Sequence, residues 1–373
     1  MNHFIKNIHI NKLFHLENID IPIENEKYPH LIITGKNGSG KTILLNAIAE
    51  VISNIEILDD NAKLTSYDGS RNVSVEFVGK RRQENIIAVF YQADRNVKMY
   101  EPKSPTKPDY IKKGNIKETV TNQFLYFMSD LKIQEALARN EKLFDDADKI
   151  NAWFVDFESL LKQIFQDDEL KLEFNYKDYS FKICTEGKKF KFTQLSDGFS
   201  AALDIVADLI LKMQDDNSLT RSYQREGIVL IDEIETHLHL ELQKIIMQFL
   251  TKTFPNIQFI VTTHSPFVLS SMENAVAYDL EYGHLIDDLT NYSYEVLAEG
   301  YFGVSTESST VEMRLKRLES LLSQKVWSDS DKNEMRQLMC ELDKVSEAVS
   351  PDLVGEYIKL KLNNINIIKG IVK

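Results

Sequence analysis

Residues 34–42 read TGKNGSGKT and directly follow the apolar run of residues 31–33. This segment fits G-x-x-x-x-G-K-[ST], a pattern in which glycines let successive backbone N–H groups face a triphosphate and the lysine adds a positive charge. Apolar residues then recur with helical spacing, so the phosphates would lie at a helix N-terminus, which carries roughly half a positive charge. A strand, this loop and a helix in that order predict an α/β P-loop NTPase that binds ATP or GTP. The loop residues expected to contact the nucleotide are Gly35, Asn37, Gly38, Ser39, Gly40, Lys41 and Thr42.

The composition is that of a globular protein. Of the 373 residues, 43% are hydrophobic and 27% are charged. No apolar stretch approaches the ~20 residues that span a bilayer, and the N-terminus lacks a signal-peptide core. We therefore expect a cytoplasmic protein with no membrane partner. Cys184 and Cys340 lack metal-ligand spacing and are expected to be reduced thiols.

The charge limits which macromolecules the chain can bind. A formal net charge of −13 opposes general adhesion to nucleic acid, because duplex binding depends on neutralising phosphates with lysine and arginine. The basic segments 80–82 and 188–189 are expected to be solvated. Any contact with nucleic acid would therefore be local.

Apolar periodicity predicts the order of the elements. Residues 227–231 and 257–261 are continuous apolar runs separated by an amphipathic helix over 240–253, a pattern typical of buried parallel strands. The core is therefore predicted to be a parallel sheet within an α/β fold. Further strands are expected near 4–10, 16–23, 73–78, 86–91, 170–174 and 181–184, and further helices over 41–52, 118–165 and 197–214.

Four regions follow from these patterns. Residues 1–95 are expected to form a β-rich lobe that carries the phosphate loop, and residues 96–168 a proline-containing loop followed by a helical insertion. Residues 169–290 would form the second lobe. Residues 291–373 are expected to be a helical subdomain, in which apolar residues between 335 and 349 repeat at alternating spacings of three and four. We expect this repeat to pack on its own core rather than on a partner helix.

Two acidic residues follow the strand at 227–231. Asp232 is expected to complete a magnesium shell opposite Thr42, and Glu233 to orient or deprotonate the attacking water. His264, in the segment VTTHSP after the next strand, is placed to reach a γ-phosphate or the water near Glu233. Glu233, His264 and Lys41 are thus the candidate catalytic residues.

A further motif completes a recognisable order. The segment Leu195–Phe199, LSDGF, opens a helix shortly before the Asp-Glu strand and resembles the signature motif of ABC-type ATPases. Gln92, at the end of a predicted strand, would correspond to the Q-loop glutamine and would join Thr42 and Asp232 at the metal. The whole series resembles the heads of SMC, RecF and RecN proteins. Three blocks, QLSDGFSAALDIVADLI, GIVLIDEIETHLHLELQ and FPNIQFIVTTHSPFVLSS, resemble the OLD-like ATPases of bacterial anti-phage systems, a group that includes the PtuA subunit of Septu and retron-linked ATPases.

The resemblance implies an ABC-ATPase-like head that uses ATP and Mg²⁺ and pairs with a second copy. Each ATP would be sealed between the Lys41 loop of one subunit and Ser196 and Gly198 of the other. This sequence departs from the LSGGQ pattern of the family, because Asp197 replaces a glycine and Phe199 replaces the glutamine. Turnover is therefore expected to be slow or dependent on a partner.

The leading hypothesis is an ATPase that acts as sensor or scaffold and controls a separate effector, a nuclease or a toxin, in anti-phage defence. No HNH or Toprim metal cluster is visible in the sequence, so nuclease action is assigned to that effector. The alternative is a RecF-like or SMC-like DNA-binding ATPase of DNA repair. The acidic net charge and the short insertion disfavour it. An energising subunit of a transporter is a third reading, for which no coupling surface can be identified.

Overall fold

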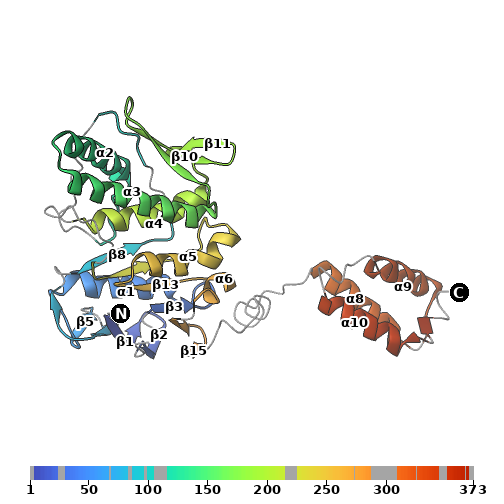
Figure 1. The fold of residues 1–373 in the computed structure, drawn as a ribbon. Coiled ribbons are helices and arrows are strands. Elements are labelled where there is room, and N and C mark those ends of the chain that lie inside the picture. Colours follow the sequence, from blue (N-terminus) through green and yellow to red (C-terminus); the bar gives the residue numbers. More distant parts are fainter. Residues whose placement is uncertain are drawn as a thin grey trace. The chain divides into compact units, whose positions relative to one another are not determined.

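The computed structural model describes residues 4–23, 30–66, 69–82, 86–95, 99–104, 116–214, 225–272, 274–286, 309–324, 326–343, 351–365 and 367–368. The chain divides into two compact units, residues 1–294 and residues 295–373. Each unit has its own apolar core. Figure 1 labels the helices and strands of both units.

A six-stranded sheet forms the centre of the first unit and confirms the α/β prediction. Its strand order is β15-β14-β3-β13-β12-β8, and all neighbours pair in parallel except β15. Strand β13 therefore separates β3, which leads into the phosphate loop, from β12, which leads into Asp232. Because parallel strands end at the same edge, the segments that follow β3, β13 and β12 are neighbours. The strands are β3 (His30–Thr34), β8 (Ile87–Tyr91), β12 (Gly227–Ile231), β13 (Ile257–Thr262), β14 (Ala275–Asp279) and β15 (His284–Ile286).

Alternate residues of these strands point to opposite faces of the sheet, and helices cover both faces. On one face, Phe90, Ile228 and Leu230 share an apolar cluster with helix α1 (Lys41–Asn54). On the other face, the Tyr91 hydroxyl donates to the Asp208 carboxylate of helix α4 (Asp197–Lys212) at 2.7 Å. Helices α5 (Leu240–Thr253) and α6 (Pro266–Leu269) follow β12 and β13, respectively.

A four-stranded antiparallel sheet forms the β-rich N-terminal part, in the order β2-β1-β6-β5. Its strands are β1 (Ile5–Leu13), β2 (Leu16–Pro22), β5 (Ala62–Thr65) and β6 (Arg71–Phe77), and β4 (Ile57–Leu58) pairs with β7 (Arg81–Arg82) beside it. Gln258 joins this part to the central sheet: its amide oxygen accepts the backbone N–H groups of Phe4 and Ile5, at 3.0 and 2.7 Å, and its amide nitrogen donates to the Ile5 carbonyl at 3.0 Å. A buried polar side chain that is fully paired in this way fixes the position of β1.

The helical region contains two long helices and a small antiparallel sheet. Helices α2 (Phe124–Asn140) and α3 (Phe144–Phe165) pack through aromatic rings, with Phe127 against Trp153 and Phe124 against Phe157, each at a centroid distance of 5.4 Å. The short 3-10 turn η2 (Thr121–Gln123) precedes them, and η3 (Phe192–Gln194) leads into α4. Strands β9 (Lys171–Asn175), β10 (Ser180–Thr185) and β11 (Lys188–Lys191) form the sheet between α3 and η3. Most of the proline-containing loop, residues 105–115, lies outside the described residues.

The second unit is helical. Helices α8 (Ser309–Leu322), α9 (Asp329–Leu342) and α10 (Pro351–Asn363) enclose a core that includes Leu318, Met335 and Tyr357. The predicted repeat does pack on this core at 335, 338 and 342, while positions 345 and 349 lie outside the described residues. Among the helices that the structure describes, none combines the length and apolarity that a bilayer span requires.

Candidate functional site

The phosphate loop leaves β3 and enters α1 through left-handed glycines. Gly35, Gly38 and Gly40 have φ values of 133°, 86° and 102°. Gly40 is the N-cap of α1, and a Cβ there would lie 2.9 Å from a Leu16 methyl carbon. The loop thus needs glycine both for its backbone conformation and for its approach to the N-terminal sheet.

Lys41 points back into this loop. Its side chain is buried, and Nζ donates to the carbonyl oxygens of Gly35 at 2.8 Å and Lys36 at 3.0 Å. Burial lowers the pKa of the Lys41 ammonium, and the carboxylates of Glu233 and Asp232 oppose this shift. The ammonium therefore lies inside the loop, held by carbonyls that a bound phosphate would replace.

A chain of hydroxyl and carboxylate groups joins the loop to the Asp-Glu strand. The Thr42 hydroxyl donates to Asp232 Oδ2 at 2.8 Å, and the Thr262 hydroxyl donates to Asp232 Oδ1 at 2.6 Å. Thr262 also accepts the backbone N–H of Glu233 at 2.8 Å. The structure thus brings together Thr42 and Asp232, the expected oxygen ligands, and their hard oxygen donors fit Mg²⁺.

Glu233 lies on a strained turn that Arg95 holds from outside. The backbone of Glu233 has a φ of 44°, a region that a residue with a side chain seldom adopts. The Arg95 guanidinium donates to the carbonyl oxygens of residues 232, 233 and 234 at 3.2, 3.0 and 3.3 Å. These three hydrogen bonds fix the backbone of the turn. The fixed backbone in turn sets the direction of the half-buried Glu233 side chain.

His264 lies at the end of β13, between the loop strand and the Asp-Glu strand. Burial and the positive charge of Lys41 both lower the pKa of the His264 imidazole, which is therefore neutral near pH 7. The Glu235 carboxylate accepts the backbone N–H of His264 and, at 2.7 Å, the Thr263 hydroxyl. Burial raises the pKa of Glu235. The strand order thus gathers Lys41, Asp232, Glu233 and His264 at one edge of the sheet.

The LSDGF segment is elsewhere on the unit and does not contact the loop through any hydrogen bond among the described residues. Ser196 is exposed at the N-cap of α4, and its hydroxyl makes no capping hydrogen bond. At Gly198 a Cβ would lie 2.9 Å from the backbone oxygen of His237, so the helix approaches this segment too closely for any side chain. Phe199 stacks on Phe165 at a centroid distance of 4.2 Å, which gives the substituted residue a packing role.

Gln92 is exposed directly after β8. Among the described residues its side chain makes no hydrogen bond to Thr42 or Asp232. It shares an edge of the sheet with them through the neighbouring strand β12, and this placement leaves its predicted role untested.

Several residues beside the loop were not predicted from the sequence. A cavity of about 540 Å³ adjoins the phosphate loop, and the size is in the range of small-molecule sites. His15, from the β1–β2 turn, contacts the loop through its Nε2, 3.2 Å from the Ser39 carbonyl oxygen. Local patterns could not reveal this site, because its walls come from segments more than 200 residues apart. The cavity is lined by His15, Leu16, Glu17, Ile19, Lys36, Asn37, Gly38, Ser39, Leu280 and Glu281.

The sheet order, the phosphate loop and the paired Thr42 and Asp232 define an ABC-type P-loop ATPase fold. A family model described as "AAA domain, putative AbiEii toxin, Type IV TA system" matches residues 120–270, which include the signature-like segment, Asp232 and His264 but not the phosphate loop.

Curated relatives carry the names that the motifs indicated. Septu protein PtuA from Bacillus mycoides (strain KBAB4) is 26% identical over 91% of this chain, and the chain spans 50% of that relative. The Retron Vc95 probable ATPase of Vibrio cholerae and the Retron Ec83 probable ATPase of Escherichia coli are 42% and 47% identical, over 24% and 22% of this chain and 18% and 15% of their own lengths. The resemblance to PtuA and retron ATPases is thus confirmed.

Solved structures of low similarity include heads of the SMC class. The SMC head domain from Thermotoga maritima has a TM-score of 0.41 at 14% identity, covering 74% of this chain and 94% of that one. Stu0660 of Streptococcus thermophilus has a TM-score of 0.36 at 12% identity, covering 94% and 99%. The fold assignment rests on the strand order and the loop rather than on these values.

Proposed function

We propose that this chain binds and hydrolyses ATP, that two copies pair head to tail around the nucleotide, and that the paired state controls a separate effector in anti-phage defence. The observation that carries the ATPase proposal is the meeting of Lys41, Thr42, Asp232, Glu233 and His264 at the carboxyl edge of three adjacent strands. The names of the relatives support the defence setting.

Each residue has a chemical task in this proposal. The loop N–H groups and the helix N-terminus bind the phosphates, and the Lys41 ammonium leaves the Gly35 and Lys36 carbonyls to bind them too. Mg²⁺, held by Thr42 and Asp232 and by Gln92 if it moves inward, would neutralise phosphate charge. Glu233 takes a proton from the attacking water. The neutral His264 orients that water or the γ-phosphate by hydrogen bonding.

The base of the nucleotide has a natural place beside the loop. The cavity next to Lys36–Ser39 takes the nucleoside, with the His15 ring and the Leu16 and Leu280 side chains as its walls.

The exposed groups of the signature-like segment support the proposed pairing. Ser196 is exposed at the start of α4, and its hydroxyl is not consumed in capping the helix. A hydroxyl and a helix N-terminus left open to solvent form an anion-binding surface. We assign them to the γ-phosphate bound by the loop of the other copy.

Slow or partner-dependent turnover is consistent with the hydrogen bonds of the phosphate loop. Lys41 is bonded to its own loop, and Thr42 is bonded to Asp232, so phosphate and metal must displace existing hydrogen bonds before they can bind. A partner that binds more tightly to the chain when these hydrogen bonds are broken would lower the free energy needed to break them. The partner would therefore raise the rate of ATP hydrolysis.

A mixing experiment tests the pairing. Lys41→Ala and Ser196→Arg are each expected to be inactive, because each removes one half of every composite site. Mixed in equal amounts, half of the pairs would be mixed and each would hold one intact site, so about a quarter of wild-type hydrolysis should return. Phosphate release measures this. Activity that stays at the level of the separate variants would contradict pairing around the nucleotide.

The alternative, a RecF-like or SMC-like DNA-binding ATPase, has one observation in its favour. The pairing register of β9, β10 and β11 places four lysines, Lys171, Lys182, Lys189 and Lys191, on the same face as Glu173, opposite the buried Phe181 and Ile183. Lys189 pairs with Glu173, and Lys191 with Glu101. Under this reading duplex DNA should raise ATP hydrolysis, and added salt should remove the effect steeply. An ATPase rate that ignores DNA at low salt would reject it.

A further inference from the structure

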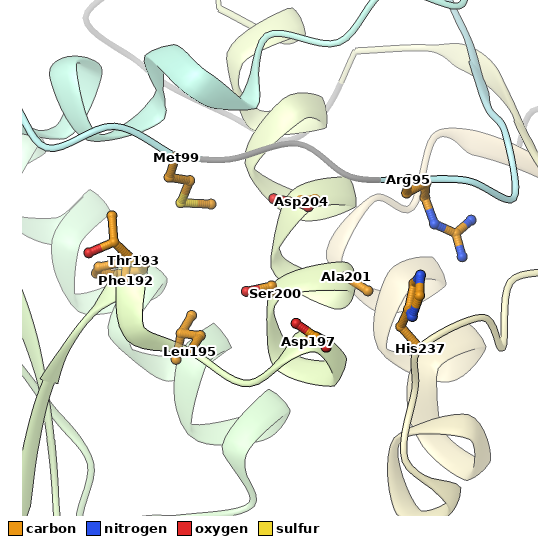
Figure 2. Close-up of a pocket in the computed structure, with 10 residues that line it drawn as sticks. All are labelled: Arg95, Met99, Phe192, Thr193, Leu195, Asp197, Ser200, Ala201, Asp204 and His237. Atoms are coloured by element: carbon orange, nitrogen blue, oxygen red, sulfur yellow. The ribbon is translucent and has the colours of Figure 1, made fainter.

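A second cavity lies at the start of α4, and the proposed hydrolysis does not use it. Its volume is about 400 Å³, and Figure 2 shows the side chains that surround it. They come from the segment after β8, from η3 and the residue that follows it, from the first two turns of α4, and from the segment after β12. The lining residues are Arg95, Met99, Phe192, Thr193, Leu195, Asp197, Ser200, Ala201, Asp204 and His237.

Asp204 is a buried carboxylate without a partner in the described part of the chain. It is only 8% exposed, it lines the cavity, and no hydrogen bond or ion pair of its carboxylate is found among the described residues. Burial raises the pKa of Asp204 to about 7, and the charge of Arg95 opposes this shift. An unpaired carboxyl group in such a place is costly to the fold.

Asp208, one turn later on α4, is a buried carboxylate whose hydrogen bonds are all made. It is fully buried, yet it accepts from the Tyr91 hydroxyl at 2.7 Å, from the backbone N–H of Val120 at 2.6 Å and from Lys212 Nζ at 2.8 Å. The fold therefore pairs one carboxylate of this helix and leaves the other facing a cavity.

The residues that line the cavity fit a ligand with a positively charged group and an apolar chain. Arg95 is the one cationic side chain among the lining residues, and it is bonded to the three carbonyls of the Glu233 turn, with no ion pair to Asp204 among the described residues. Asp197 adds a second carboxylate to the lining, and the two carboxylates together favour a cation inside the cavity. Within the described residues no group of three His, Cys, Asp or Glu side chains could hold a metal ion. The apolar walls are Met99, Phe192, Leu195 and Ala201.

We propose that this cavity binds the guanidinium or ammonium group of an arginine or lysine side chain from a protein partner, with Asp204 as its counter-ion and Phe192 beside its stem. A protein-borne cation is favoured over a free amine because the cavity adjoins the N-terminus of α4, which the proposed pairing brings into contact with another protein chain. The inference therefore deepens the proposed partner control. Because Arg95 both lines the cavity and holds the Glu233 turn, the site is next to the hydrolytic machinery.

N-propylguanidinium chloride, which has the side-chain atoms of arginine, is the probe, and N-propylurea is its uncharged match. We expect the cation to raise the melting temperature of the purified full chain without nucleotide, with a dissociation constant in the millimolar range, and the urea to have no effect. Asp204→Asn should weaken binding of propylguanidinium at least tenfold, which is about the effect of losing one charged hydrogen-bonded pair. Asp168→Asn, which removes an exposed charge, should leave it unchanged.

The pH dependence gives a second readout on the wild type. The pKa of Asp204 is higher in the folded chain, so its unpaired charge destabilises the fold as pH rises through about 7, and this effect is absent below the ordinary carboxyl range. Among the described residues, the ionisable groups around it are Asp197, Asp208, His237, Arg95 and Tyr91. Binding of the cation should weaken from about pH 8 to about pH 5.5 as Asp204 takes up its proton.

Two results would overturn the site: equal effects of propylguanidinium and propylurea, or cation binding that survives Asp204→Asn. Cation binding that does not weaken on acidification would overturn it even if that variant does not fold. Tight binding of a free polyamine, with no preference for a peptide that carries arginine, would overturn the protein-partner assignment. None of these measurements needs ATP, so failure of the proposed ATPase would be seen separately in phosphate release.

Discussion

Glu233→Gln is expected to slow ATP hydrolysis by about 10²- to 10³-fold and to leave ATP affinity nearly unchanged, because a general base is removed while the shape of the side chain is kept. The turn that carries it should survive, since Arg95 and Thr262 hold its backbone rather than its side chain. With ATP bound and hydrolysis blocked, paired copies should accumulate. Phosphate release, ATP binding and the mass of the ATP-loaded species measure the three effects.

Glu186→Gln is the matched control, since it makes the same change at an exposed turn position. It should hydrolyse ATP at the wild-type rate. If Glu233→Gln also kept the wild-type rate, Glu233 would not be the base, and the assignment of the Asp-Glu pair would be wrong.

Gly227→Ala is expected to destabilise the first unit by about 3 kcal/mol or more, at the upper end of the range for overpacked cores. Gly227 is buried at the start of β12, between β8 and β13. A Cβ there would lie 2.3 Å from the carbonyl oxygen of Ile87 and 2.8 Å from its Cβ. Relief requires the separation of two paired strands, so the urea midpoint of unfolding should fall clearly.

Gly355→Ala is expected to change stability in the opposite direction. This glycine is inside α10, and a Cβ would meet no atom within 4 Å. Alanine should therefore stabilise the helix by about 0.5–1 kcal/mol. An unchanged unfolding midpoint for Gly227→Ala would contradict the close packing of β8 on β12.

Local patterns were enough to predict the elements whose sequences carry their own periodicity or loop chemistry. The phosphate loop, β12, β13, α4 and α5 are of this kind, because each buries a continuous apolar run or repeats with helical spacing. Strands β14 and β15 were not predicted, since their short mixed sequences are stabilised by pairing with β3 and with each other.

Tertiary contacts of the site could be predicted only in part. The order of motifs implied that Lys41, Asp232 and His264 meet, and the insertion of β13 between β3 and β12 explains why they do. The roles of Thr262 and Arg95 depend on hydrogen bonds to backbone groups 29 to 139 residues away, for which no local signal exists. The unpaired state of Asp204 is likewise visible only in the fold.

The substitutions in the signature-like segment have different explanations. Phe199 replaces a polar residue because it packs on Phe165 at the end of α3, which ties the helical region to the start of α4. Asp197 lines the cavity that contains Asp204. Phe199 thus connects the proposed pairing surface to α3, and Asp197 connects it to the cavity at the start of α4.

In the proposed function, one nucleotide is shared by two copies of this chain. The most direct measurement is an experimental structure of Glu233→Gln with ATP and Mg²⁺. We predict that the γ-phosphate accepts hydrogen bonds from Lys41 Nζ of one copy and from Ser196 Oγ of the other. A nucleotide bound by Lys41 alone, with Ser196 of every copy in solvent, would contradict the account.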